Sequence, residues 1–191
     1  MKADLYQNVC RFIFDKTGIV FGDDKTYLIE SRLTPVARKH GYADVDGLAQ
    51  SLGEGKAAVL TDVVDALTTN ETFFFRDGKP FEEFRQHVLP QLIERRAQRK
   101  QLRIWSAACS SGQEAYSLAM ILQEEGAKLQ GWRTEIVGTD ISRAVVARAQ
   151  AGSFSQFEVQ RGLPIQMLVK YFRQNGDRWD VVPQVRSMVQ F

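Results

Sequence analysis

The stretch RIWSAACSSGQEAYSLAMILQEEGAKLQGWRTEIVGTD, residues 103–140, decides the fold of this chain. Its pattern of apolar and small residues predicts four successive elements. These are a strand at 103–107, a loop of small residues at 108–112, a helix at 113–125 and a second strand at 135–138. The second strand leads into an acid, Asp140. This order is the outline of a nucleotide-binding βαβ unit, in which N–H groups at a helix N-terminus and a carboxylate after the next strand face the ligand.

The sequence of the loop argues against a dinucleotide. Residues 107–114 read AACSSGQE rather than G-x-G-x-x-G, and Glu114 would repel a pyrophosphate. A ligand with adenosine at one end and a cation at the other fits better. S-adenosylmethionine (SAM) is such a ligand, because it carries a sulfonium and an ammonium but no phosphate. An NAD-dependent oxidoreductase is disfavoured for the same reasons.

The composition is that of an ordinary globular protein. The 191 residues are 44% hydrophobic and 25% charged, which suits one large domain or two small ones. A net charge of +2 does not indicate a nucleic-acid binder. His40 and His87 have no cysteine, histidine or acid at ligand spacing, so no metal site is predicted.

The sequence has no feature of a membrane-inserted or secreted protein. No apolar run approaches the ~20 residues that span a bilayer. Asp4 and Asp15 flank the N-terminal apolar positions, which is not the pattern of a secretory signal. Cys10 and Cys109 are far apart in apolar surroundings, as expected of reduced thiols. We therefore expect a cytoplasmic protein without direct membrane insertion.

Residues 1–66 are expected to form a small helical bundle with short connections. Apolar residues at helical spacing predict a first helix that Gly18 ends, and two later helices at 45–52 and 57–67. Between them lies a further helix, in which Pro35 is expected to bend or split the chain.

The remaining segments predict helices at 81–92, where Pro90 strains the pattern, at 142–151 and at 163–172. From Gly176 to Phe191 apolar residues alternate around a proline. This alternation predicts two short antiparallel strands.

Three motifs follow one another along the chain. They are LTTNETFFFR at 67–76, WSAACSSGQEAYS at 105–117 and TDI at 139–141. In this order they resemble the patterns L-T-T-N-x-T-x-F-F-R, W-S-A-A-x-S-x-G-x-E-x-Y-S and T/S-D-I of the bacterial chemotaxis receptor methyltransferases, the CheR family. Three ordered matches of this length are specific, and the helical N-terminus also resembles that family.

The resemblance implies an α/β fold: a small N-terminal helical bundle, then a SAM-dependent, Rossmann-like methyltransferase domain with a small antiparallel β insert. We expect the helical domain at residues 1–66, a linker segment and helix at 67–102, and the SAM domain at 103–191, with the insert at about 153–191. Relatives continue with further parallel strands, which bring an Asn and a Tyr to the cofactor. Because two parallel strands do not form a stable doubly wound sheet, we expect the chain to be truncated or completed by another polypeptide.

Two acids are candidates for cofactor binding. Asp140 after the second strand can accept both ribose hydroxyls, or can cap the helix that follows. Glu114 lies in the first turn of a helix, where the helix dipole favours a negative charge. The resemblance implies that Glu114 instead pairs with the ammonium of the methionine part of SAM.

The loop and the first motif supply the other candidates. Ala108 and Gly112 let the backbone approach a ligand closely, and a tight strand-to-helix turn requires the same small residues. Asn70, Thr72 and Arg76 are either solvated residues of a linker anchored by phenylalanines or, as the resemblance implies, line the cofactor and substrate cleft. If the segment is a strand, Thr72 and Arg76 share one face with Phe74. Arg76 is also the candidate catalytic residue, which would hold the substrate carboxylate bidentately.

The resemblance implies SAM-dependent methylation of glutamate side chains of methyl-accepting chemotaxis receptors, with S-adenosylhomocysteine as the product. Glutamate is ionised near neutral pH, with a reference pKa of ~4.3, so the reaction needs alignment rather than a general base. The alternative is a truncated, non-catalytic module that binds receptors or other proteins. A basic face of Arg32, Arg38 and Lys39 is either merely solvated or, by resemblance, docks on the acidic methylation region of the receptors. In some relatives the insert binds a receptor peptide by strand addition.

Overall fold

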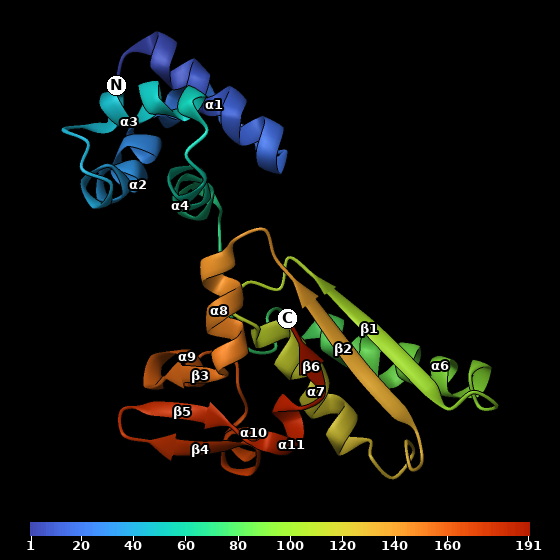
Figure 1. Cartoon of the computed structure of the whole chain (residues 1–191). Coiled ribbons are helices and arrows are strands. Elements are labelled where there is room, and N and C mark those ends of the chain that lie inside the picture. Colours follow the sequence, from blue (N-terminus) through green and yellow to red (C-terminus); the bar gives the residue numbers. More distant parts are fainter. The chain divides into compact units, whose positions relative to one another are not determined.

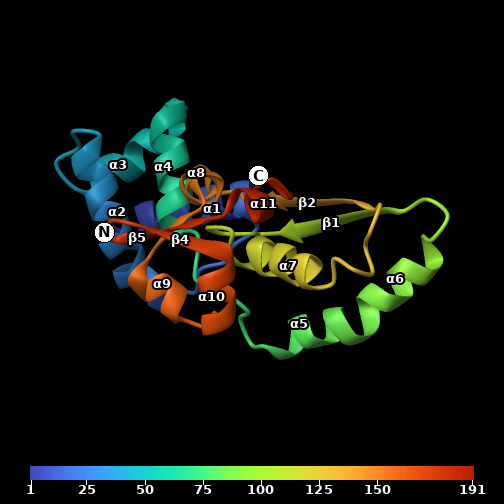
Figure 2. The same cartoon turned by 90° about the horizontal axis from the view of Figure 1, so that it is seen from below.

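The computed structural model describes residues 1–191 as two compact units (Figures 1 and 2). One unit contains residues 1–69 with 141–143, and the other contains residues 70–140 with 144–191. The first unit is helical, and the second combines helices with a parallel and a small antiparallel sheet, which confirms the predicted fold class. Crossing a bilayer would take a longer and more apolar helix than any that this chain forms.

The first unit is a bundle of four α-helices. They are α1 (Ala3–Thr17), α2 (Thr26–Lys39), α3 (Val45–Ser51) and α4 (Ala57–Leu67), with 3₁₀ turns η1 (Asp23–Lys25) and η2 (Leu52–Glu54) between them. Each long helix buries one apolar stripe, as its helical spacing requires. The core includes Val9, Ile13, Ile29, Leu33, Leu48 and Val63, all fully buried.

Pro35 does not split α2, which was one of the two outcomes expected from the sequence. The helix runs without a break from Thr26 to Lys39. Val36 and Ala37, which follow the proline, are buried in the bundle core together with Leu33. Packing on both sides of Pro35 therefore holds the helix across a position of poor intrinsic propensity.

The second unit is built on a parallel sheet of β1 (Gln101–Ala107), β2 (Arg133–Thr139) and β6 (Val189–Gln190), in the order β1-β2-β6. Strands β1 and β2 pair along their whole length, from Gln101 opposite Arg133 to Ala107 opposite Thr139. Helix α7 (Gln113–Glu124) connects them and lies along one face of the sheet (Figures 1 and 2). This is the predicted βαβ unit.

The small antiparallel sheet follows α8 (Arg143–Ala151). Its strands are β3 (Ser153–Ser155), β4 (Phe172–Asn175) and β5 (Arg178–Val181), in the order β3-β5-β4. Helices α9 (Gln156–Gln160) and α10 (Ile165–Tyr171) lie between β3 and β4 in the chain (Figure 1).

The prediction of two antiparallel strands between Gly176 and Phe191 is wrong in part. Only β5 is such a strand, and its partners are β3 and β4. Pro183 begins α11 (Pro183–Arg186), because its fixed φ suits the first turn of a helix. Val189 then enters β6 opposite Ile136, so the parallel sheet has three strands instead of the expected two.

The helix expected at 81–92 is also different in detail. It consists of α5 (Lys79–Glu83), a π-helical turn η3 (Phe84–Val88) and α6 (Leu89–Arg95). Pro90 lies in the first turn of α6. The proline needs no helical hydrogen bond there, so the change of helix type accommodates it.

A buried aromatic cluster joins the parts of the second unit. The Phe74 ring lies 4.9 Å from Phe154 and 5.5 Å from Phe172, both in edge-to-face geometry. Tyr116 of α7 packs in the same way on Phe154, with ring centroids 6.0 Å apart. Phe74 therefore ties the segment before α5 to both α7 and the antiparallel sheet.

We expect Phe74→Ala to lower the free energy of unfolding of this unit by about 3–5 kcal/mol, because Phe74 is fully buried among aromatic rings. Urea unfolding followed by tryptophan fluorescence measures the change. Phe157→Ala is the matched control, since Phe157 is 72% exposed, and its effect should stay within about 0.5 kcal/mol. Equal losses in the two variants would contradict the packing role of Phe74.

Candidate active site

The loop between β1 and α7 has an unusual backbone. Ala108, Ser110 and Gly112 have φ angles of 57°, 48° and 93°. A non-glycine residue in this region costs on the order of 1–3 kcal/mol, so the surroundings must hold the loop in place. The N–H of Cys109 donates to the Thr139 carbonyl at 2.9 Å, and the N–H of Gly112 donates to the Cys109 carbonyl at 2.9 Å.

Asp140 is bound to this loop. The Ser110 N–H donates to Oδ2 of Asp140 at 2.8 Å. The parallel register brings this about, because Ala107 and Thr139 are paired at the ends of β1 and β2. The carboxylate is half-buried and lies at the edge of the sheet where ligands of such folds bind.

Glu114 lies at the carboxyl end of β1. The Ser106 hydroxyl, at the end of that strand, donates to Oε1 of Glu114 at 2.7 Å. Glu114 is exposed, although its neighbours Gln113 and Ala115 are buried. It is in the first turn of α7. The position favours its charge through the helix dipole and also presents the carboxylate to a ligand cation.

Gly112 packs closely against three neighbouring side chains, which leave no room for a Cβ at this position. A Cβ at this position would lie 3.0 Å from both Ala149 Cβ and Phe191 Cζ, and 3.2 Å from Tyr116 Cε2. The turn and its close contacts therefore both need glycine. Ala108, by contrast, is exposed at the sheet edge, where a ligand can reach it.

The segment that carries Asn70, Thr72 and Arg76 is not a strand. It is an irregular stretch followed by a turn at 74–77, in which Phe75 and Asp77 have φ of 50° and 63°. The alternation of faces that a strand would produce is therefore absent: Thr72 is half-buried and Arg76 exposed. Phenylalanine packing outweighs strand propensity here, because Phe74 has to reach the aromatic cluster.

Asn70 nevertheless lies beside the loop, since its carbonyl accepts a hydrogen bond from the Ser110 hydroxyl at 2.7 Å. Arg76 is held at the surface, where its guanidinium donates to the Glu71 carbonyl at 2.8 Å. A second bond fixes the turn, from the Phe75 N–H to the Ser117 hydroxyl at 3.1 Å. The structure thus connects Asn70, the loop and Asp140 directly.

The sequence analysis missed the roles of several serines. Ser106, Ser110 and Ser117 orient Glu114, Asn70 and Phe75, respectively. All three lie inside the second motif, which is the only signal that singled them out.

The basic face expected on α2 is only partly present. Arg32 donates to the Leu67 and Thr68 carbonyls at the end of α4, at 3.3 and 3.4 Å. Lys39 pairs with Asp62 at 2.7 Å. Arg38 is exposed, so it is the best placed of the three for a partner.

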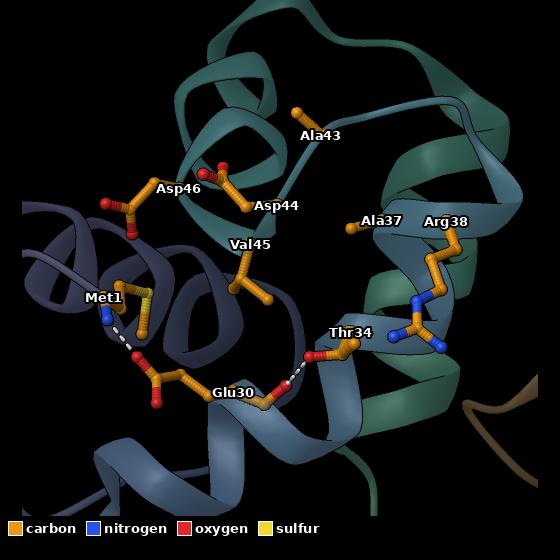
Figure 3. Close-up of a pocket in the computed structure, with 9 residues that line it drawn as sticks. All are labelled: Met1, Glu30, Thr34, Ala37, Arg38, Ala43, Asp44, Val45 and Asp46. Atoms are coloured by element: carbon orange, nitrogen blue, oxygen red, sulfur yellow. Dashed lines mark hydrogen bonds and ion pairs between the residues drawn. The ribbon is translucent and has the colours of Figure 1, made fainter.

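A hollow of about 360 Å³ in the first unit is lined by three acids, Glu30, Asp44 and Asp46, and by Arg38 (Figure 3). Glu30 binds the N-terminal ammonium of Met1, and Asp44 accepts from the Gly47 N–H as the cap of α3. Asp46 accepts from the Lys2 N–H at 3.3 Å, so all three carboxylates have partners within the fold. No group of His, Cys, Asp or Glu side chains is arranged to hold a metal ion.

The parallel βαβ unit, with acids at the ends of both strands, defines a Rossmann-like domain of the class that binds nucleoside ligands. Residues 70–191 match the family described as "CheR methyltransferase, SAM binding domain", and residues 4–68 match "CheR methyltransferase, all-alpha domain". The chain belongs to the CheR methyltransferase family. The predictions of this family and of SAM as the cofactor are confirmed.

Individual relatives agree with this assignment. The chain is 43% identical to "Chemotaxis protein methyltransferase 1" of Pseudomonas aeruginosa over 95% of its own length and 68% of the relative's. It is 38% identical to "Chemotaxis protein methyltransferase Cher2" of Pseudomonas putida, over 94% of its length and 67% of the relative's. A third relative, "Chemotaxis protein methyltransferase 1" of Vibrio cholerae, is 37% identical over 97% of this chain and 68% of its own length.

Cys109 provides a test of the loop. Burial, and then the negative charge of Asp140, raise the pKa of its thiol to about 11. At pH 8 only about one thiol in a thousand is then ionised, so we expect iodoacetamide to leave Cys109 unmodified in the native protein. The rate at which iodoacetamide alkylates Cys109 should rise about tenfold per pH unit until the pH reaches the pKa of the thiol.

Peptide mass spectrometry measures the labelling. Cys10 is the internal control, because it is only partly buried and should react first. Native Cys109 that reacts as fast as Cys10 at pH 8 would show that the loop is not closed as described.

Proposed function

We propose that this chain transfers the methyl group of SAM to glutamate side chains of methyl-accepting chemotaxis receptors. The observation that carries the proposal is the placement of two carboxylates beside the loop at 108–112, one at the start of α7 and one after β2. Glu114 is held from the end of β1 by Ser106, and Asp140 is held from the loop itself by Ser110. An adenosyl ligand with a cationic amino-acid end needs acids at both of its ends, and the three related methyltransferases support this interpretation.

Each candidate residue has a proposed part in binding SAM. Asp140 accepts hydrogen bonds from the ribose hydroxyls, and Glu114 pairs with the ammonium of the methionine part. Ala108 and Gly112 let the backbone of the loop approach the ligand closely, while Asn70 and Thr72 extend the cleft along the neighbouring segment. The exposure of Glu114 and Ala108 and the half-burial of Asp140 are consistent with such a ligand at the edge of the sheet.

When bound, SAM supplies a methyl group activated by its sulfonium. An oxygen of the substrate carboxylate forms the new bond to the methyl carbon, while the bond from that carbon to sulfur breaks and sulfur keeps the electron pair. The products are a neutral methyl ester and S-adenosylhomocysteine. Because the carboxylate is already ionised near neutral pH, with a reference pKa of ~4.3, no residue has to remove a proton.

Arg76 is the proposed catalytic residue. A guanidinium binds a carboxylate through two parallel N–H bonds, and this fixes the direction of the attacking oxygen. Arg76 is exposed; its Nη1 donates to the Glu71 carbonyl and its Nε lies 4.0 Å from the Asp77 carboxylate, so Nη2 is left for the substrate. Orientation of two bound reactants can lower a barrier by roughly 7–11 kcal/mol in favourable cases.

The non-catalytic binding module is the weaker candidate. All three relatives described above are named as methyltransferases, and the residues of the loop motif are held in an ordered arrangement. We also propose the domain limits 1–66, 67–102 and 103–191, receptor docking through Arg38, and a cytoplasmic location.

The two acids can be tested with two ligands. Glu114→Gln should raise the Kd for S-adenosylhomocysteine about 10–100-fold, because one charge-assisted contact of about 1.5–3 kcal/mol is lost. The same variant should leave the Kd for 5′-methylthioadenosine unchanged, since that ligand has no ammonium. Asp140→Asn should weaken both ligands, because both contain the ribose. Isothermal calorimetry measures each Kd.

Asp177→Asn is the matched control, as Asp177 is an exposed acid in the turn between β4 and β5. Asn at position 140 keeps an oxygen to accept the Ser110 N–H, so the loop should stay closed. Equal sensitivity of both ligands to Glu114→Gln would refute the assignment of Glu114 to the ammonium.

Methyl transfer itself tests Arg76. With tritiated SAM and receptor-containing membranes, the wild type should label receptor glutamates. Arg76→Ala should lower kcat/KM about 10²-fold, in line with the loss of one oriented charge donor, and Arg76→Lys should lie between the two. Arg173→Ala, another exposed arginine of the same unit, should match the wild type. Receptor binding without any label would favour the non-catalytic alternative.

A further inference from the structure

The turn between α9 and α10 touches the segment that carries Arg76. Arg161 of this turn pairs with the Glu71 carboxylate, with Nη2 and Oε1 2.8 Å apart. The Arg161 guanidinium also lies over the Phe73 ring, 4.3 Å from its centroid. The turn therefore reaches the proposed site from a part of the chain about 90 residues away in sequence.

Glu71 links Arg161 to Arg76. Its side chain binds Arg161, and its backbone carbonyl accepts from Arg76 at 2.8 Å. Both guanidinium groups face the Phe73 ring, since Arg76 lies 5.8 Å from the same centroid. The hydrogen bond and charge of Arg161, and then the charge of Arg76, hold the pKa of Glu71 below its usual value. Glu71 therefore stays ionised at neutral pH and keeps the link intact.

Gly162 allows this turn to approach the Phe73–Phe74 backbone closely, because it has no side chain. Its φ is +79°, and a Cβ at this position would lie 2.0 Å from the Phe74 carbonyl oxygen and 2.9 Å from Phe73 Cδ2. No side chain fits there without displacement of the Phe74 backbone. The turn is thus pressed directly against the residues that precede Arg76.

We propose that Arg161 is a positioning residue for methyl transfer, which acts through Glu71 and Phe73 to hold the Asn70–Arg76 segment and so the guanidinium of Arg76. The inference rests on the proposed function for the role of Arg76. An exposed ion pair adds little to global stability, so the effect of Arg161 is on the local conformation. The contact connects the antiparallel insert to the candidate active site.

The first test measures the segment itself and needs no cofactor. In Arg161→Ala, the Phe75 N–H, which donates to Ser117, should exchange with deuterium about fivefold faster than in the wild type, a change of about 1 kcal/mol. Arg148→Ala is the matched control. Arg148 forms an equivalent ion pair with Glu158 at 2.7 Å and touches no residue of the segment, so its removal should leave Phe75 unchanged.

The second test is kinetic. Arg161→Ala should lower kcat for receptor methylation about fivefold while its thermal midpoint stays within about 2 °C of the wild type. Arg161→Lys should recover part of the loss, because it keeps the ion pair but not the planar stacking on Phe73. In an Arg76→Ala background, Arg161→Ala should have no further effect on kcat, since it acts through Arg76.

The third test uses glycine. Gly162→Ala should loosen Phe75 and lower kcat more than Arg161→Ala. Gly176→Ala has the same type of backbone, with φ +62°, but no atom lies within 4 Å of its Cβ position. The difference between the two variants isolates the clash with Phe74 from backbone strain.

Two results would overturn the inference. One is a Phe75 N–H that exchanges with deuterium at the same rate in Arg161→Ala and Arg148→Ala. The other is a loss of kcat on Arg161→Ala that is as large in the Arg76→Ala background as in the wild type. If Arg161→Ala loosens Phe75 but the wild type neither binds S-adenosylhomocysteine nor transfers methyl groups, the contact stands and the proposed function fails.

Discussion

The constraint on which this structure depends is the closure of the loop between β1 and α7. Backbone bonds from Cys109 and Ser110 to Thr139 and Asp140 pull it onto the end of β2, and the Ser110 hydroxyl joins it to Asn70. Left-handed conformations at non-glycine residues are unfavourable, so these bonds must compensate. Because the loop is closed in this way, the two acids and the preceding segment meet at one edge of the parallel sheet.

Phe73, Phe74 and Phe75 are consecutive in the segment beside the loop, and each packs in a different environment. Phe74 enters the buried cluster with Phe154 and Phe172, and Phe75 packs edge-to-face on Phe81 at 5.3 Å. Phe73 stays near the surface as a platform for two guanidinium groups. The apolar core thus holds the backbone of a segment in which Thr72 and Arg76 flank the three rings.

The sequence predicted the positions of the two acids better than the conformation of the segments around them. Glu114 and Asp140 follow from short-range order, because a loop after one strand and an acid after the next are adjacent in any parallel pair. The antiparallel pairing of the last residues was wrong in part, and the segment at 67–76 is not the strand that was considered for it; both ideas rested on local alternation. Val189 instead pairs with β2, and Phe74 is buried in the aromatic cluster, so tertiary packing decides the conformation of both segments. Both contacts join residues far apart in the chain, so the local sequence could not predict them.

The order of motifs alone determined the family, the helical and α/β parts and the cofactor, because these depend on residues close together in the chain. The tertiary structure decided what holds those residues in place. Ser106 supports Glu114, Asp140 closes the loop, Arg32 binds the end of α4 instead of forming a docking face, and Arg161 reaches Glu71. The last two of these contacts join residues 35 and 90 positions apart, and only the packing of the folded chain brings such residues within hydrogen-bond distance.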